Sequence, residues 1–445
     1  MLEAVANYRL RVASLPTTGI PNWVPATVGA AALVPMTNTA DNVLTSGSYS
    51  QGGNNFNIGD YSGGRYAPNY GSLGAMIVHG GGHAATQRND VITADFNDLA
   101  WKVDGAPTDL SAVGKFVDYV DDTGGIYTTS YDYFIRRGPN STGWLESNNG
   151  NSSLFEFPTT WGDPTVNPCE IVQDEPGSAH TYDSMFILPP SMGGGSKGSL
   201  IRVMGFAVGA TTSSSSGFAH RFDLDAKTWE RYSTNGCAWA SACGVAFDSA
   251  AGRAWVVNTG TNTGALSYLD TGTKTWGSVT GSSGVVDDGY IDNVIACWHA
   301  AKSIAIHATT SNPPGSSARF YWFSTTSSQG TRSEVTWTNG TAPPHFSYGS
   351  GTLCDIPEFG KVFYYAASDL DAYYLFTVPA NPANQWTWER IAITGTVPSA
   401  LSPAPRLVIY HRMDYAPQLR SVMWVLSQAN GPQFGGRVLC IRVAP

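Results

Sequence analysis

The feature that most constrains the fold of this chain is a strand ending that recurs along its length. Alternating apolar runs end in a tryptophan, as in "HRFDLDAKTW" and "LSYLDTGTKTW", and the first three of five such endings carry an aspartate shortly before the tryptophan. Alternation of apolar and polar residues is typical of β-strands with one buried face. Its recurrence predicts a repeat architecture. The five tryptophans are Trp101, Trp229, Trp276, Trp337 and Trp388.

A second repeated element, a strand–turn–strand pattern, lies upstream of each such ending. It reads "FDSAAGRAWVV" from Phe247 and "YAPQLRSVMWVL" from Tyr415, and similar stretches begin at Tyr66, Trp298 and Cys354. A short polar turn between two β-prone runs favours an antiparallel hairpin. Together with the tryptophan-ending pair, each unit contains four antiparallel strands in about 45 to 80 residues, which is typical of a β-propeller blade.

The number of blades depends on the long interval between Trp101 and Trp229. Segments that start at Thr128 ("TTSYDYFIRRG") and Ala179 ("AHTYDSMFILPP") resemble each other, and each is expected to open a blade. We therefore interpret residues 105–178 as an irregular blade or insertion. This gives an all-β chain, 1–445, folded as a single propeller with seven blades, and six blades are the alternative.

The last unit, which begins at Arg406, contains three strands before the sequence stops. The N-terminal stretch "YRLRVASLPTTGIPNWV", which carries Trp23, has the character of the missing strand. We expect a strand within residues 1–27 to pair into the last blade and close the ring. Such pairing leaves no open sheet edge between the first and last blades.

A glycine cluster follows the second strand of the first unit, in "GGGHAATQRND" from Gly80, and precedes a strand with a spaced tryptophan. This arrangement resembles a Kelch repeat, which also occurs in galactose-oxidase-like propellers. The resemblance covers most of the chain, although the double glycine is clear only in the first unit. It implies the propeller fold, whereas Kelch propellers serve as enzymes, binding platforms and structural pieces. The copper site of such oxidases needs two His and two Tyr with one Tyr joined to a Cys, and no short motif places these together here, so no oxidase activity is carried over.

Charge and motifs exclude several classes of partner. The formal charge is −9, from 25 basic and 34 acidic side chains, which is the wrong sign for a protein that binds nucleic acid through its phosphates. The apolar run "VGAAALVPM" is too short to span a bilayer, and the N-terminus lacks a basic n-region, so we expect no membrane insertion and no signal peptide. The six cysteines lack zinc-ligand spacing, and no phosphate loop or dinucleotide motif occurs. We expect no metal ion and no cofactor; buried thiols and disulfides both remain open.

Candidate site residues follow from blade topology. In a four-stranded antiparallel blade, the loop between the second and third strands lies at the same end as the start of the first strand, and propellers commonly bind ligands at such a channel mouth. If the protein is an enzyme, the candidates for proton transfer are His83, His180 and Tyr182. The expected ligand-binding residues at the mouth are Asp60, Tyr61, Asn89, Tyr131, His345 and Tyr348, and Trp144 and Trp161 from the irregular region are expected to contact a ligand as well.

Three functions are compatible with these patterns. The first is a non-catalytic binding or assembly propeller, extracellular or part of a virion such as a phage tail, that recognises surface glycans or partner proteins and forms a homo-oligomer or larger assembly. Its motivation is a composition with few lysines and abundant Gly, Ser, Thr and Asn, and long loops. The alternative is a lyase on acidic polysaccharides, with the His and Tyr candidates in a groove supplied by arginines; these are Arg65, Arg88, Arg136, Arg137 and Arg412. An intracellular Kelch interaction domain ranks last.

Overall fold

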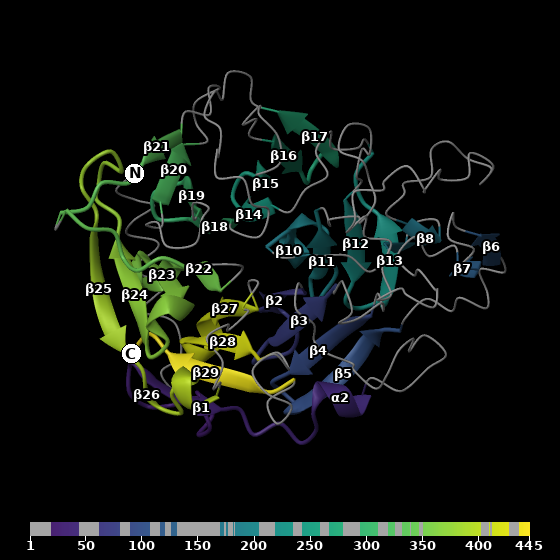
Figure 1. Ribbon diagram of the computed structural model, residues 1–445, viewed down its shortest axis with the longest axis horizontal. Helices are drawn as coiled ribbons and strands as arrows, with labels where there is room; N and C mark the ends of the chain where they lie inside the picture. Colours follow the sequence, from purple (N-terminus) through teal and green to yellow (C-terminus); the bar gives the residue numbers. More distant parts are fainter. Residues whose placement is uncertain are drawn as a thin grey trace.

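Six of the β-sheets in this computed structural model are arranged radially around a common axis, as its described residues show (Figure 1). These residues are 19–43, 62–80, 90–106, 116–120, 126–130, 170–172, 175–176, 181, 183–203, 219–234, 243–258, 267–278, 294–309, 319–324, 332–338, 340–346, 350–401, 409, 412–426 and 436–445. The arrangement is that of a six-bladed β-propeller. The prediction of an all-β propeller is confirmed, and six blades, the alternative, replace the expected seven.

Each of the first five blades contains four consecutive antiparallel strands. In blades 1 and 2 they are β2 (Gly63–Ala67), β3 (Ala75–His79), β4 (Val91–Asp95) and β5 (Ala100–Gly105), then β10 (Met185–Leu188), β11 (Ser199–Arg202), β12 (His220–Asp223) and β13 (Thr228–Arg231). In blades 3 and 4 they are β14 (Cys243–Asp248), β15 (Arg253–Asn258), β16 (Ser267–Asp270) and β17 (Thr275–Ser278), then β18 (Val294–His299), β19 (Ile304–Thr309), β20 (Arg319–Ser324) and β21 (Arg332–Glu334). Blade 5 contains β22 (Gly351–Ile356), β23 (Lys361–Ala366), β24 (Ala372–Thr377) and β25 (Thr387–Ala392). The five predicted strand–turn–strand stretches all coincide with the first two strands of a blade.

Blade 6 combines strands from both ends of the sequence. Its order is β26 (Thr394–Gly395), β1 (Ala30–Leu33), β29 (Val438–Arg442), β28 (Ser421–Val425) and β27 (Met413–Ala416). Strand β1 runs antiparallel to β29, with Ala32 opposite Cys440. The strand therefore lies outside the predicted range 1–27: residues 19–27 contain no strand, and residues 1–18 lie outside the described part. Trp23 instead packs against Phe96 of blade 1, with ring centroids 6.1 Å apart.

The described strands in 105–178 do not form a blade. Strands β6 (Phe116–Val120) and β7 (Ile126–Ser130) form one two-stranded sheet, and β8 (Glu170–Val172) and β9 (Glu175–Pro176) form another. Figure 1 shows β6 and β7 outside the ring of six blades. Two-stranded sheets that belong to no blade explain why the count is six and not seven.

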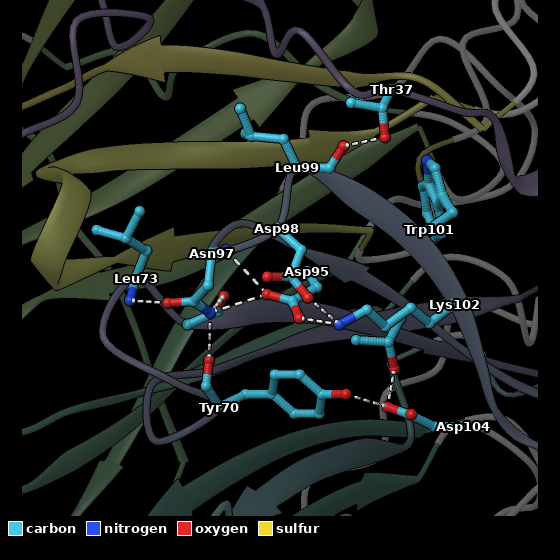
Figure 2. Close-up of polar contacts among 12 residues, drawn as sticks. Thr37, Tyr70, Leu73, Asp95, Asn97, Asp98, Leu99, Trp101, Lys102 and Asp104 are labelled. Atoms are coloured by element: carbon cyan, nitrogen blue, oxygen red, sulfur yellow. Dashed lines mark hydrogen bonds and ion pairs between the residues drawn. The ribbon is translucent and has the colours of Figure 1, made fainter.

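The aspartate of the repeated strand ending closes the turn between the third and fourth strands. Asp223 Oδ1 accepts hydrogen bonds from the Asp225 and Ala226 amides, at 2.8 and 3.0 Å, and Asp270 Oδ1 does the same for two amides of its own turn. Figure 2 shows the same turn in blade 1, where Asp95 accepts from the Asn97 amide at 2.8 Å. The fourth residue after each aspartate has a positive φ of 51° to 60°; these are Leu99, Lys227 and Lys274. Because a carboxylate that accepts backbone amides stabilises a tight turn, the motif is structural.

The hydrophobic core lies between blades, as expected for radially stacked sheets. Six clusters of buried residues occur in the described part, and each joins two neighbouring blades, including one between blades 6 and 1. Trp101 lies in that last cluster and is almost fully buried. Trp337 differs from the prediction because it follows β21 in the connection to blade 5, where it packs edge-on against Phe376 and Trp386. The cysteines Cys297, Cys354 and Cys440 are free and buried.

Candidate functional site

Of the predicted site residues, only His345 belongs to the described part of the chain. His345 is half-buried, and its carbonyl accepts a hydrogen bond from the Ser368 hydroxyl, just after β23. It therefore lies at the end of blade 5 where the second strand finishes. The residues outside the described part are His83, His180, Tyr182, Asp60, Tyr61, Asn89, Tyr131, Trp144, Trp161 and Tyr348. Residues that flank several of them belong to the described part.

Thr181 joins the segments on which most of the candidates lie. Its buried hydroxyl donates to the carbonyl of His79, the last residue of β3, at 2.7 Å, and accepts the Gly63 amide, at the start of β2, at 2.8 Å. Thr181 itself lies between the candidates His180 and Tyr182 in the sequence. The Thr181 side chain thus connects the start of β2, the end of β3 and the segment that leads into β10 by hydrogen bonds.

The end of β3 is fixed by a second set of contacts. The His79 ring, 1% exposed, contacts the Asp90 carbonyl through Nδ1 at 3.0 Å, and it packs against Trp229 of blade 2 with centroids 4.8 Å apart. His79 and Asp90 are the strand ends between which the sequence stretch with His83 and Asn89 runs. Both ends of that stretch are therefore anchored beside blade 2.

Arg412, in front of β27, brings blade 6 to the same place. It is fully buried, and its guanidinium donates through Nη1 to the Ser62 carbonyl at 3.1 Å and through Nε to the Val425 carbonyl at 3.3 Å. Ser62 directly follows the candidates Asp60 and Tyr61. We call this region, defined by Ser62, His79, Asp90, Thr181 and Arg412, the loop-side mouth, and the opposite end of the ring the turn side.

Below the mouth, the axis of the ring contains a buried ion pair. The Arg65 guanidinium of β2 pairs with the Asp183 carboxylate, and both side chains are buried. Asp183 Oδ2 also accepts the Ala296 amide of β18 at 2.6 Å, and its carbonyl accepts the Val245 amide of β14 at 3.1 Å. Asp183 itself belongs to blade 2, so these three contacts join blade 2 to blades 1, 3 and 4 near the axis.

The carboxyl groups at the axis are electrostatically perturbed. Burial raises the pKa of Asp183 to about 7, against the opposing influence of Arg65, and the charge of Asp414 raises it further. Burial also raises the pKa of Asp414, whose Oδ2 accepts the Tyr66 amide at 2.9 Å. Burial raises the pKa of the nearby Cys297 thiol well above its usual value, which favours the neutral thiol over the thiolate.

These contacts change the interpretation of two arginines that were candidates for a basic groove that binds acidic polysaccharides. Arg65 and Arg412 are buried and engaged by protein groups, so neither presents its charge to a polysaccharide. Arg88, Arg136 and Arg137 lie outside the described residues. Sequence reasoning missed Thr181 and Asp183, because their side-chain partners His79, Gly63 and Arg65 lie 102 to 118 residues away in the sequence.

The described residues offer neither a metal-binding cluster nor a membrane-spanning helix. No group of three or more His, Cys, Asp and Glu side chains in these residues is placed to hold a metal ion. Within the same residues, no helix combines the length and apolar character needed to cross a bilayer.

The chain was compared with known proteins. No protein-family model and no curated protein matches the sequence. Among solved structures, it is similar to TolB from Acinetobacter baumannii, at 12% identity and a TM-score of 0.31, over 82% of this chain and 62% of that one. It is also similar to an auxiliary nutrient binding protein from Bacteroides ovatus, at 8% identity and a TM-score of 0.39, over 85% and 68%. The chain thus spans 62% of the length of the TolB structure. At these scores the likenesses carry no functional argument, and membership of the Kelch or galactose-oxidase family is not confirmed.

Proposed function

We propose that this propeller is a non-catalytic binding or assembly protein that recognises surface glycans or partner proteins at its loop-side mouth. The proposal rests on the hydrogen bonds of the Thr181 hydroxyl to the Gly63 amide and the His79 carbonyl, which we call the Thr181 node. This node joins the residues that flank three candidate segments. These segments contain Asp60 and Tyr61, His83 and Asn89, and His180 and Tyr182. Binding residues on loops that a rigid scaffold holds are the usual arrangement in proteins.

The residue types around the node suit a neutral or weakly charged polar ligand. Aspartate, asparagine and histidine side chains offer hydrogen-bond donors and acceptors, and tyrosine adds an apolar face with a polar tip. Sugars present hydroxyl groups beside apolar ring faces, so these side chains match their chemistry. The two buried arginines are engaged in holding strands together, which removes part of the groove that a lyase on acidic glycans needs.

The proposed setting is extracellular or a virion, such as a phage tail, where the ring forms part of a homo-oligomer or larger assembly. Its support is compositional: the chain contains seven lysines among 445 residues, with 49 glycines and long loops rich in Ser, Thr and Asn. A surface that is poor in lysine and rich in small polar groups suits contact with glycans more than with nucleic acid.

A glycan array, run beside an ultraviolet assay for unsaturated uronate release, tests the proposal. We expect wild-type protein to bind a subset of glycans without new absorbance. The double variant His180→Ala, Tyr182→Ala is expected to lose this binding, whereas Ser249→Ala, an exposed turn-side control, is expected to keep it.

Three outcomes contradict the proposal in different ways. New absorbance makes the protein a lyase and turns His83, His180 and Tyr182 into candidate catalytic residues. Glycan binding that survives in the double variant moves the site away from the loop-side mouth. Absence of binding to all glycans rejects the glycan form and leaves partner proteins, which a pull-down from assembled particles with the same two variants then tests.

A further inference from the structure

A threonine recurs shortly after the fourth strand of a blade and contacts the next blade. In the described part of the chain, Thr37 follows β1, Thr234 follows β13 and Thr338 follows β21. The amide and the hydroxyl of each threonine donate to one carbonyl oxygen of the following blade, at 2.7–3.0 Å from the amide and 3.1–3.3 Å from the hydroxyl. We call this pair of hydrogen bonds the threonine clasp. The three acceptor carbonyls belong to Leu99, Lys274 and Trp386, respectively.

The acceptor carbonyl occupies the same place in each blade. It belongs to the residue directly before the fourth strand, in blades 1, 3 and 5. Leu99 and Lys274 are the residues of positive φ in the aspartate turns, with φ of 51° and 57°. Similarly, Thr394 of β26 donates its amide to the carbonyl of Gly29, directly before β1, at 2.9 Å. A clasp therefore joins the end of one blade to the turn that precedes the fourth strand of the next blade.

The geometry of the clasp explains the residue type. Thr37, Thr234 and Thr338 are exposed, so burial does not favour threonine at these positions. Serine and threonine carry a hydroxyl on Cβ, which lets the side chain and the amide of the same residue reach a common acceptor. A carbonyl oxygen has two lone pairs and can accept both bonds. The recurrence of threonine thus follows from the clasp and not from packing.

At the boundary between blades 6 and 1, the clasp lies on the N-terminal segment. Next to the clasp, Asn38 donates through Nδ2 to the Trp101 carbonyl at 3.1 Å and accepts the Trp101 amide through Oδ1 at 2.6 Å. The Val34 amide donates to the carbonyl of Val438, the first residue of β29, at 2.9 Å. This short segment therefore contacts β29 of blade 6 and β5 of blade 1 at the same time.

We propose that the threonine clasp is a conformational device that fixes each turn relative to the preceding blade, and that the Thr37 clasp closes the ring between blades 6 and 1. Each clasp joins two neighbouring blades, so loss of one clasp should loosen one blade boundary and leave the others closed. The proposal concerns the ring itself and does not depend on which ligand binds at the mouth.

The test replaces one clasp threonine at a time, in Thr37→Val, Thr234→Val and Thr338→Val. Valine keeps the shape and the amide of threonine but lacks the hydroxyl. Hydrogen–deuterium exchange resolved to single amides gives the protection factors at all three positions in every variant. We expect the protection factor at the substituted position to fall about threefold, because a hydrogen bond exposed to water contributes at the low end of the usual range. The protection factors at the other two positions should not change.

The matched controls are Thr37→Ser, Thr234→Ser and Thr338→Ser, which retain the hydroxyl and should retain the wild-type protection. Because the three side chains are exposed, we expect the variants to fold, which urea denaturation checks. An equal loss at all three positions in each valine variant overturns the proposal, since the hydroxyls would then act on the stability of the whole ring and not on their own boundary. Unchanged protection factors in the valine variants overturn it as well.

Discussion

Replacement of Thr181 by valine tests whether one hydroxyl organises the loop-side mouth. Valine has the same shape as threonine without the hydroxyl, so Thr181→Val removes the hydrogen bonds to the Gly63 amide and the His79 carbonyl, at 2.8 and 2.7 Å, and little else. Thr181 is fully buried, which means that water cannot replace the lost partner.

The expected loss of stability follows from these two bonds. A buried group that loses its hydrogen-bond partner costs about 1–3 kcal/mol, and the extra methyl group of valine returns part of this, so we expect a net loss of about 2 kcal/mol. Thr181→Ser retains the hydroxyl and should lose about 1 kcal/mol for the missing methyl group.

Urea denaturation of the two variants and wild type measures both values. The same variants should separate in binding: Thr181→Val is expected to weaken binding at the mouth, whereas Thr181→Ser retains it. A Thr181→Val protein as stable as wild type would refute the reasoning, because it would mean that Gly63 and His79 do not depend on the hydroxyl.

Three further predictions concern the blades themselves. Neither ring nitrogen of buried His307 has a hydrogen-bond partner among the described residues, and burial lowers the pKa of His307 well below 6.5, so stability should fall as the pH drops below 6.5. His307→Phe should be neutral or stabilising by about 1 kcal/mol in thermal melts and should abolish this loss of stability in acid, and a strongly destabilised variant would contradict the assignment. Asp270→Ala should destabilise by about 1–2 kcal/mol in urea titrations at pH 7, because two turn amides lose a charged acceptor, and an unchanged midpoint would show that the turn does not need it. Ser303→Gly should increase the free energy of unfolding by about 1 kcal/mol, because Ser303 has a φ of 52°, which glycine adopts more easily than serine. Ala301→Gly in the same turn should not increase it, and equal effects of the two variants would rule out backbone strain as the cause.

The hairpins of the blades were predictable from the sequence because their signals are local. A polar turn between two apolar runs, as from Phe247 or Tyr415, determines both the strands and their pairing within a short stretch. The aspartate and tryptophan spacing gave the third and fourth strands in the same way. Trp337 is an exception. The alternation of residues before it resembles a strand ending, but Trp337 lies in the connection between β21 and β22.

The number of blades and the strand from the N-terminal region depended on long-range pairing. The β-prone stretches in 105–178 were interpreted as an irregular blade or insertion, but the strands described there form only two-stranded sheets. The strand β1, with the sequence AAAL, has no strong β-propensity of its own and exists because β29 and β26 flank it. The predicted range ends at residue 27, before β1 begins, and residues 1–18 of that range lie outside the described part.

The candidate site was predictable in outline only. Strand direction alone determines at which end of a blade a loop lies, and His345 contacts Ser368, just after the second strand of blade 5. Thr181 at the mouth and Asp183 at the axis carry no local motif, since their partners come from other blades. Arg65 and Arg412 show the converse error: a charged residue in the right region was interpreted as a ligand contact although the fold buries it.

The central claim is that ligands bind at the loop-side mouth, and hydrogen–deuterium exchange with a glycan that is positive on the array tests it most directly. We predict slower exchange in peptides that contain residues 62–64, 77–80 and 183–188, next to the Thr181 node. Turn-side peptides that contain 95–101, 223–229 and 270–276 should exchange at unchanged rates. Protection of the turn-side peptides, with none around the node, would contradict the account.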